Sequence, residues 1–166
     1  MFKLSTKKIA RSGVVGALYV VLSLVVFPVA SGAIQFRISE GLTILPLIFP
    51  EVIVGLTVGC AVTGIITGVA IYDIIFGSLI TLVAGILTAI IGKKIKGNGK
   101  KFVIGGLFPV LLNAFLLPVI WYFCYGQLSY LYALQVGFLL LGQGVSVYGV
   151  GYGLFVGANK LKEKFM

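Results

Sequence analysis

Five polar side chains interrupt the long apolar stretches of this 166-residue sequence and could contact a small solute. They comprise two carboxylates, two carboxamides and one guanidinium. A carboxylate can accept two N–H bonds, and an amide supplies both donors and an acceptor, so this set suits the edge of a flat heterocycle. An anionic solute is disfavoured because carboxylates outnumber the guanidinium, and the ring of Tyr72 could stack on the same ligand. The five residues are Arg37, Glu40, Asp73, Asn113 and Gln143.

The composition excludes several classes of protein. Apolar residues make up 60% of the chain and charged residues only 10%, whereas soluble domains carry about a quarter charged residues. A soluble enzyme, a disordered chain and a nucleic-acid-binding protein are therefore not expected. The sequence has no histidine and two cysteines, too few for a four-ligand zinc site, and no adjacent nucleophile and base. We expect neither catalysis nor a metal or cofactor.

The basic residues indicate a membrane topology. Except for Arg37, every Lys and Arg lies in one of three clusters, at Lys3–Arg11, Lys93–Lys101 and Lys160–Lys164. Basic clusters beside apolar runs mark the cytoplasmic side, so both termini and the middle loop should face the cytoplasm, next to the lipid bilayer. Residues 102–159 carry no charge and suit two helices of about 20 residues each.

The sequence therefore predicts an all-α membrane protein with six transmembrane helices in one domain, residues 1–166. The second of these helices is short and contains Pro46, so it can cross the bilayer only if neighbouring residues extend it. The predicted helices span about 9–27, 41–49, 51–69, 72–91, 102–121 and 133–158.

Counting from the basic clusters places the polar residues at similar depth. At about 1.5 Å per residue, Asp73 is one bilayer thickness from the cytoplasmic side, and Asn113 and Gln143 lie in the outer half. Arg37 and Glu40 fall in the segment outside the first helix. Charged groups inside a membrane tend to mark function, so we predict a pocket open to the outside. Alternatives for these residues are a surface ion pair between Arg37 and Glu40, a helix-terminal role for Asp73, and interhelical hydrogen bonds of Asn113 and Gln143.

Small residues recur at helical spacing and suggest two kinds of contact. Gly55 and Gly59, and the series Gly149, Gly153 and Gly157, suit close packing between helices of the same bundle. A second stripe lies on the apolar first helix, where a smooth surface suits docking to another membrane protein. This stripe consists of Ala10, Gly13 and Ala17.

Two segments resemble the QueT family. Residues 33–46 read AIQFRISEGLTILP and residues 73–81 read DIIFGSLIT. The family comprises substrate-binding S components of energy-coupling factor (ECF) transporters, whose members are thought to take up queuosine precursors of the 7-deazaguanine type. The resemblance implies six helices, an outward-facing pocket without catalysis, and docking to an ECF module made of a transmembrane T component and two ATPases.

The resemblance also implies roles for particular residues. Arg37, Glu40 and Asp73 would contact the substrate, and Gly13 and Ala17 would carry the family's docking pattern. The chain has no Gly-rich phosphate loop of its own, which agrees with a subunit that depends on a partner for energy. Two other hypotheses remain open: an S component for another flat vitamin such as riboflavin or thiamine, and a membrane assembly factor that binds no solute.

Overall fold

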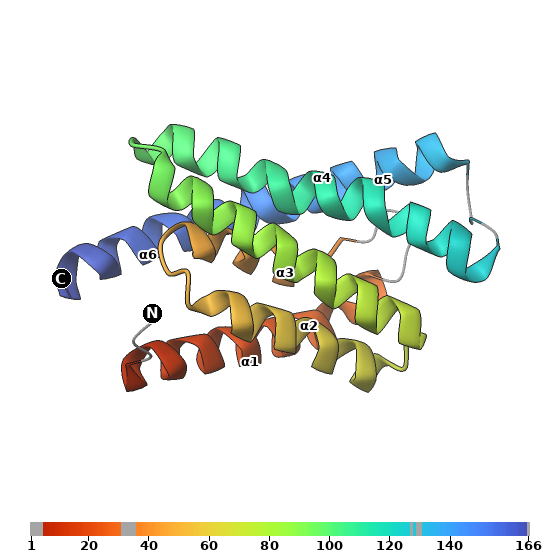
Figure 1. Ribbon diagram of the computed structural model, residues 1–166, viewed down its shortest axis with the longest axis horizontal. Helices are drawn as coiled ribbons and strands as arrows, with labels where there is room; N and C mark the ends of the chain where they lie inside the picture. The colour runs from red at the N-terminus through yellow and green to blue at the C-terminus, as the bar shows by residue number, and fades with distance from the viewer. Residues whose placement is uncertain (1–4, 31–35, 127, 129–130, 166) are drawn as a thin grey trace.

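A computed structural model describes residues 5–30, 36–126, 128 and 131–165, which form six α-helices and two other helical segments. The helices lie alongside one another, and the start of α1, the end of α6 and the turn between α3 and α4 are at the same end, called here the end with the termini (Figure 1). This arrangement brings the described parts of the three basic clusters to one end of the bundle. The elements are α1 (Thr6–Ala30), η1 (Ile38–Leu47), α2 (Val52–Thr67), α3 (Ile71–Lys94), α4 (Asn98–Tyr125), α5 (Tyr132–Gly144), η2 (Val145–Val150) and α6 (Gly151–Phe165).

Four helices are long and apolar enough to cross a membrane among the described residues. They are α1, α3, α4 and the continuous run Tyr132–Glu163, in which the π-helical segment η2 joins α5 to α6. These four spans overlap the predicted helices at 9–27, 72–91, 102–121 and 133–158. The predicted helix at 51–69 corresponds to α2, which is shorter. Six crossings and a cytoplasmic position of both termini stay predictions.

The segment expected as a short α-helix at 41–49 is instead the 3₁₀ helix η1. A 3₁₀ helix rises about 2.0 Å per residue rather than 1.5 Å, so η1 reaches farther than an α-helix of equal length. Every residue from Ser39 to Leu47 is buried, including Pro46. Irregular backbone at membrane depth is tolerated where protein surrounds it, and this burial meets that condition. Residues 31–35, which begin the predicted outer segment, lie outside the described residues.

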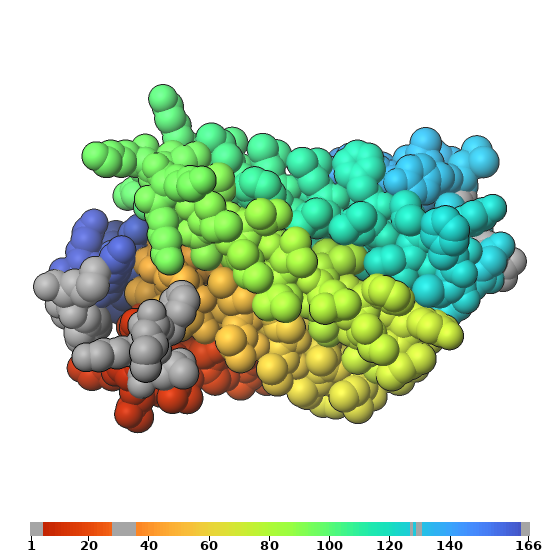
Figure 2. All heavy atoms as spheres, in the orientation of Figure 1, coloured from red at the N-terminus to blue at the C-terminus, as the bar shows by residue number. Residues whose placement is uncertain are grey.

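Helices α1 and α2 approach each other through glycine. A Cβ on Gly16 would meet the backbone of Gly55, and a Cβ on Gly59 would meet the backbone oxygen of Gly16 at 2.8 Å. The backbone N–H of Gly55 donates to Ser12 Oγ at 2.9 Å, which links the two helices. The prediction that Gly55 and Gly59 pack inside the bundle is confirmed. On the face shown in Figure 2, α3 runs between α2 and α4.

The prediction of internal packing is wrong for the other glycine series. Among the residues that the structure describes, a Cβ on Gly149, Gly153 or Gly157 would meet nothing within 4 Å, and all three residues are exposed. Instead, Gly41 of η1 makes the close approach in this region, since its Cβ would lie 3.0 Å from the Ser146 backbone oxygen. The four-residue spacing alone does not reveal which face of a helix has a neighbour.

An ion pair joins α1 to the start of α2 near the end that holds the termini. Arg11 Nη1 lies 2.6 Å from Glu51 Oε1, and its guanidinium lies 4.0 Å above the centre of the Phe49 ring. Glu51 occupies the N-cap position of α2 but makes no capping hydrogen bond with its side chain. Its carboxylate therefore connects two helices as well as lying beside the positive end of the α2 dipole.

Candidate functional site

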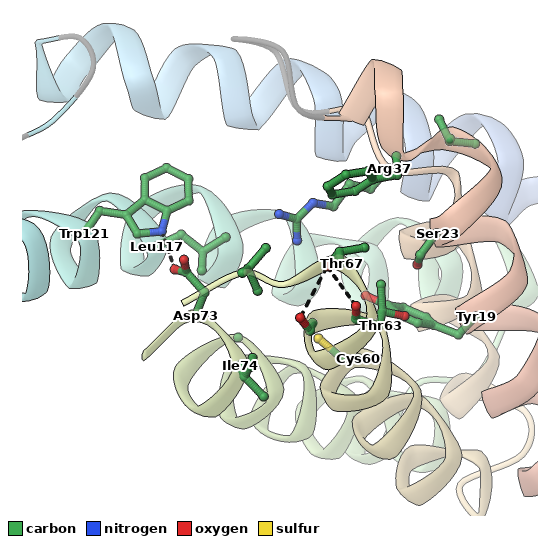
Figure 3. Close-up of a pocket in the computed structure, with 15 residues that line it drawn as sticks. Tyr19, Ser23, Arg37, Cys60, Thr63, Thr67, Asp73, Ile74, Leu117 and Trp121 are labelled. Carbon is green, nitrogen blue, oxygen red and sulfur yellow. Dashed lines mark hydrogen bonds between the residues drawn. The ribbon is translucent and has the colours of Figure 1, made fainter. Parts of the chain in front are cut away.

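A cavity of about 310 Å³ lies in the half of the bundle opposite the termini, and this volume is within the range of small-molecule sites. The second half of α1, the last turns of α2, the start of α3 and the end of α4 line it, together with Arg37. Figure 3 shows side chains from these elements converging on one space. The polar and sulfur-bearing lining residues are Tyr19, Ser23, Arg37, Cys60, Thr63, Thr67, Asp73 and Trp121.

Of the predicted site residues, Arg37 and Asp73 line the cavity. Arg37 is the N-cap residue of η1, with an extended backbone at φ −116° and ψ 98°. Its guanidinium points into the cavity in Figure 3. A guanidinium carries five N–H donors and no acceptor, so it can bind carbonyl oxygens or ring nitrogens of a ligand.

The carboxylate of Asp73 connects α3 to α4. Its Oδ1 accepts a hydrogen bond from Trp121 Nε1 at 2.8 Å, and its Oδ2 accepts one from the Tyr125 hydroxyl at 2.9 Å. The indole of Trp121 lines the cavity beside it. Because both oxygens already accept a bond, Asp73 fixes the orientation of an aromatic ring that a flat ligand could stack against.

Glu40 lies behind the cavity wall rather than on the surface. Its side chain is 2% exposed, and its Oε1 accepts a bond from the Tyr19 hydroxyl at 2.6 Å. Tyr19, which is also 2% exposed, lines the cavity in front of it. The alternative that places Glu40 in an ion pair at the surface is wrong, because η1 turns the Glu40 side chain into the core. Burial of a carboxylate requires such a partner.

The sequence reasoning missed Tyr19. A usable signal was present, because Ser12, Gly16, Tyr19 and Ser23 recur at four- and three-residue intervals and so share one face of α1. Ser12 and Gly16 contact α2 on this face, while Tyr19 and Ser23 line the cavity. Together they identify the face of α1 that is directed into the bundle.

The other three predicted site residues do not line this cavity. Asn113 is buried, and its Nδ2 donates to the Pro109 backbone oxygen on its own helix. Gln143 is 1% exposed, and its Oε1 has no hydrogen-bond partner among the described residues. Tyr72 is 48% exposed and stands edge-on to Tyr125. A role for these three in substrate binding stays a prediction.

The docking residues predicted on α1 lie on its outer face. Ala10, Gly13 and Ala17 are all exposed, and a Cβ on Gly13 would meet nothing within 4 Å. The same helix therefore has one face packed through Gly16 and a second, smooth face without a neighbour among the described residues. As for metals, no group of three or more Cys, Asp and Glu side chains that could hold an ion occurs in the described part of the chain.

Comparison with known proteins identifies the family. The sequence model of the QueT transporter family matches residues 9–160. A queuosine precursor transporter QueT from Lactococcus lactis subsp. cremoris (strain MG1363) is 34% identical over 85 residues, which are 50% of this chain and 50% of that protein. The matched segment thus covers about half the length of this relative. No solved structure matches the chain. With its long apolar helices, the chain is a multi-pass membrane protein that belongs to the QueT transporter family, a family of transporters and not of enzymes.

Proposed function

We propose that this protein binds a queuosine precursor of the 7-deazaguanine type in the cavity beside Arg37, Asp73 and Trp121. The observation that carries this proposal is the set of groups that line one space: a guanidinium, an indole ring and several hydroxyl oxygens. A 7-deazaguanine is flat, with a carbonyl that an Arg can bind and an N–H edge that oxygen atoms can accept. Membership in the QueT transporter family supports the same class of ligand.

The position of the cavity supports uptake from outside the cell. Each helix that lines the cavity does so with the part that lies at the end of the bundle opposite the termini. The basic clusters lie at the other end of the bundle, where the termini are (Figure 1). By the positive-inside rule the basic end is cytoplasmic, so the cavity belongs to the outer half of the membrane. In this proposal the protein binds its ligand from the outside. It then reorients within the transporter complex and releases the ligand inside the cell.

We further propose that the chain acts as the S component of an ECF transporter and docks to the ECF module through Ala10, Gly13 and Ala17. These residues form a smooth, exposed strip on α1, and small residues allow the helices of two membrane proteins to approach closely. The partner would be the transmembrane T component, with two ATPases supplying energy. The lipid bilayer covers the remaining exposed apolar faces.

Gly13→Leu is expected to abolish co-purification with the ECF module and to reduce uptake at least tenfold, while the isolated subunit keeps its affinity for ligand. The leucine side chain would project from the exposed strip and separate the two proteins, but within the described part of the chain its Cβ would meet no atom of a neighbouring element within 4 Å. Co-purification, uptake by cells and calorimetric titration of the isolated subunit measure the three effects.

Gly153→Leu provides a matched control, because Gly153 is an equally open, exposed glycine on α6. This variant should assemble and transport normally. Loss of assembly in both variants would contradict a docking surface confined to α1. Normal assembly of Gly13→Leu would contradict the docking assignment itself.

The test of the substrate is a titration of the purified subunit in detergent with 7-deazaguanine-type queuosine precursors, guanine, riboflavin and thiamine. We expect saturable binding of a deazaguanine and no saturable binding of the two vitamins. Tight binding of riboflavin or thiamine would keep the architecture and overturn the substrate. A folded protein that binds none of these compounds would favour an assembly factor.

A further inference from the structure

We propose that three hydroxyl groups on the α1 and α2 side of the cavity can only accept hydrogen bonds from a ligand, and that they select ligands by their N–H donors. These three residues, the acceptor wall, are Tyr19, Thr63 and Thr67, which line the cavity together with Ser23 and Cys60. The inference rests on the proposed function, because it states how the same cavity discriminates among flat heterocycles. Its central residue is Tyr19, with Glu40 as a positioning residue behind it.

The hydroxyl hydrogen of Tyr19 is already used within the protein. It is donated to Glu40 Oε1 at 2.6 Å, a length typical of a charge-assisted bond to a carboxylate. A tyrosine hydroxyl has one hydrogen to donate. Toward a ligand in the cavity, the Tyr19 oxygen can therefore offer only its lone pairs.

Glu40 is itself held in place by η1. Its backbone N–H donates to the Arg37 oxygen at 3.0 Å, and the Thr43 hydroxyl donates to the Glu40 backbone oxygen at 2.6 Å. Both Glu40 and Thr43 are 2% exposed. With its backbone anchored at two atoms and its side chain buried, Glu40 keeps the Tyr19 hydroxyl turned away from the cavity.

The two threonines of the acceptor wall, both on α2, use their hydrogens in the same way. Thr63 Oγ donates to the Gly59 backbone oxygen at 2.8 Å, and Thr67 Oγ donates to the Thr63 backbone oxygen at 2.8 Å. In Figure 3, Tyr19, Thr63 and Thr67 lie on the same side of the cavity, and dashed lines mark the bonds of Thr67. Three hydroxyl oxygens on one wall thus present lone pairs and no hydrogen.

The consequence for recognition is a defined ligand orientation. A heterocycle that directs N–H groups at the acceptor wall can form hydrogen bonds, whereas a carbonyl or an unprotonated ring nitrogen would face lone pairs. The edge of 7-deazaguanine that carries N1–H and the 2-amino group fits this wall. Its carbonyl oxygen would then lie toward Arg37, the donor that lines the same cavity.

The test compares three ligands on wild type and Tyr19→Phe by calorimetry in detergent. The ligands are 7-deazaguanine, 7-deazahypoxanthine, which lacks the 2-amino group, and 1-methyl-7-deazaguanine, which lacks N1–H. Wild type should bind 7-deazaguanine about tenfold more tightly than at least one of the other two, the effect of about one buried hydrogen bond. In Tyr19→Phe that preference should fall to about threefold or less.

Thr63→Val serves as a second variant in case Tyr19→Phe does not fold. It should also reduce the preference for 7-deazaguanine over one of its two analogues. Tyr148→Phe is the control, because it removes a tyrosine hydroxyl that donates to the Val103 backbone oxygen and does not line the cavity. It should keep both preferences. The readout is a ratio of affinities, which a merely structural loss would leave unchanged.

The possible failures are distinguishable. A wild type that binds all three ligands equally overturns the acceptor wall and leaves the proposed function standing. Variants that keep the wild-type ratios of affinity among the three ligands, including those that weaken binding of all three by the same factor, also overturn the acceptor wall. A folded wild type that binds none of the three overturns the proposed substrate, and the acceptor wall with it.

Discussion

Gly55→Ala is expected to destabilise the protein by about 3 kcal/mol, the upper part of the usual range for overpacking a tight contact. The added Cβ would collide with the backbone oxygen of Ser12 on α1. A backbone atom cannot rotate aside as a side chain can, so α1 must shift as a whole. The shift would also break the bond from the Gly55 N–H to Ser12 Oγ. Unfolding in mixed micelles of increasing SDS content measures the loss.

Gly13→Ala is the matched control for this prediction. Gly13 lies on the same helix as Ser12, but a Cβ there would meet nothing within 4 Å. Alanine is favoured over glycine inside a helix by up to about 1 kcal/mol, so this variant should be as stable as wild type or slightly more stable. Equal destabilisation of Gly13→Ala and Gly55→Ala would contradict the described contact between α1 and α2.

The same two glycines show what the sequence could and could not predict about packing. Hydropathy and the basic clusters are enough to predict the long helices, because the bilayer requires long apolar segments. The spacing of small residues indicated the strip at Gly13, which is exposed, and the glycine at Gly55, which is packed. The series from Gly149 to Gly157 has the same spacing as Gly55 and Gly59 but meets no neighbour. A four-residue spacing of glycines predicts a smooth helix face, but only the tertiary arrangement decides whether another helix packs against that face.

The candidate site was predicted in part, for a related reason. Counting residues along a helix gives depth, and depth placed Asp73 at the end of the bundle where the cavity lies; Arg37 was expected there because it follows the first helix. Depth does not give the direction in which a side chain points, so Asn113 and Gln143 were grouped with a cavity that they do not line. Glu40 illustrates a second limit. The 3₁₀ geometry of η1 rotates successive side chains by a different angle from an α-helix, and the sequence did not predict that geometry.

A tyrosine in an apolar helix, such as Tyr19, does not stand out from the hydrophobic residues around it in the sequence. Its hydroxyl needs a partner once the ring is buried, and the carboxylate of Glu40 satisfies that need. A tyrosine in one apolar segment and a glutamate in the next are therefore candidates for a buried pair in a membrane protein. Here such a pairing predicts that η1 packs against α1, because the two side chains can meet only across that contact.

Asp73→Ala is expected to weaken ligand binding by about ten- to a hundredfold, although Asp73 already has both oxygens bonded within the protein. The substitution leaves Trp121 Nε1 and the Tyr125 hydroxyl without their acceptor, and each such lost partner is worth about 1 kcal/mol or more. The indole that lines the cavity would then lose its fixed orientation. Calorimetric titration of the isolated subunit with 7-deazaguanine measures the effect.

Asp73→Asn separates positioning of the ring from direct contact with the ligand. Its amide oxygen can still accept from Trp121 Nε1, and its amide nitrogen can donate to the Tyr125 oxygen, so both links between α3 and α4 can persist. If Asp73 acts by orienting Trp121, Asp73→Asn should lose less than about threefold in affinity. An equal loss in Asp73→Asn and Asp73→Ala would show instead that the ligand needs the carboxylate charge itself. That result would replace the positioning role with direct binding of a donor-rich ligand by Asp73.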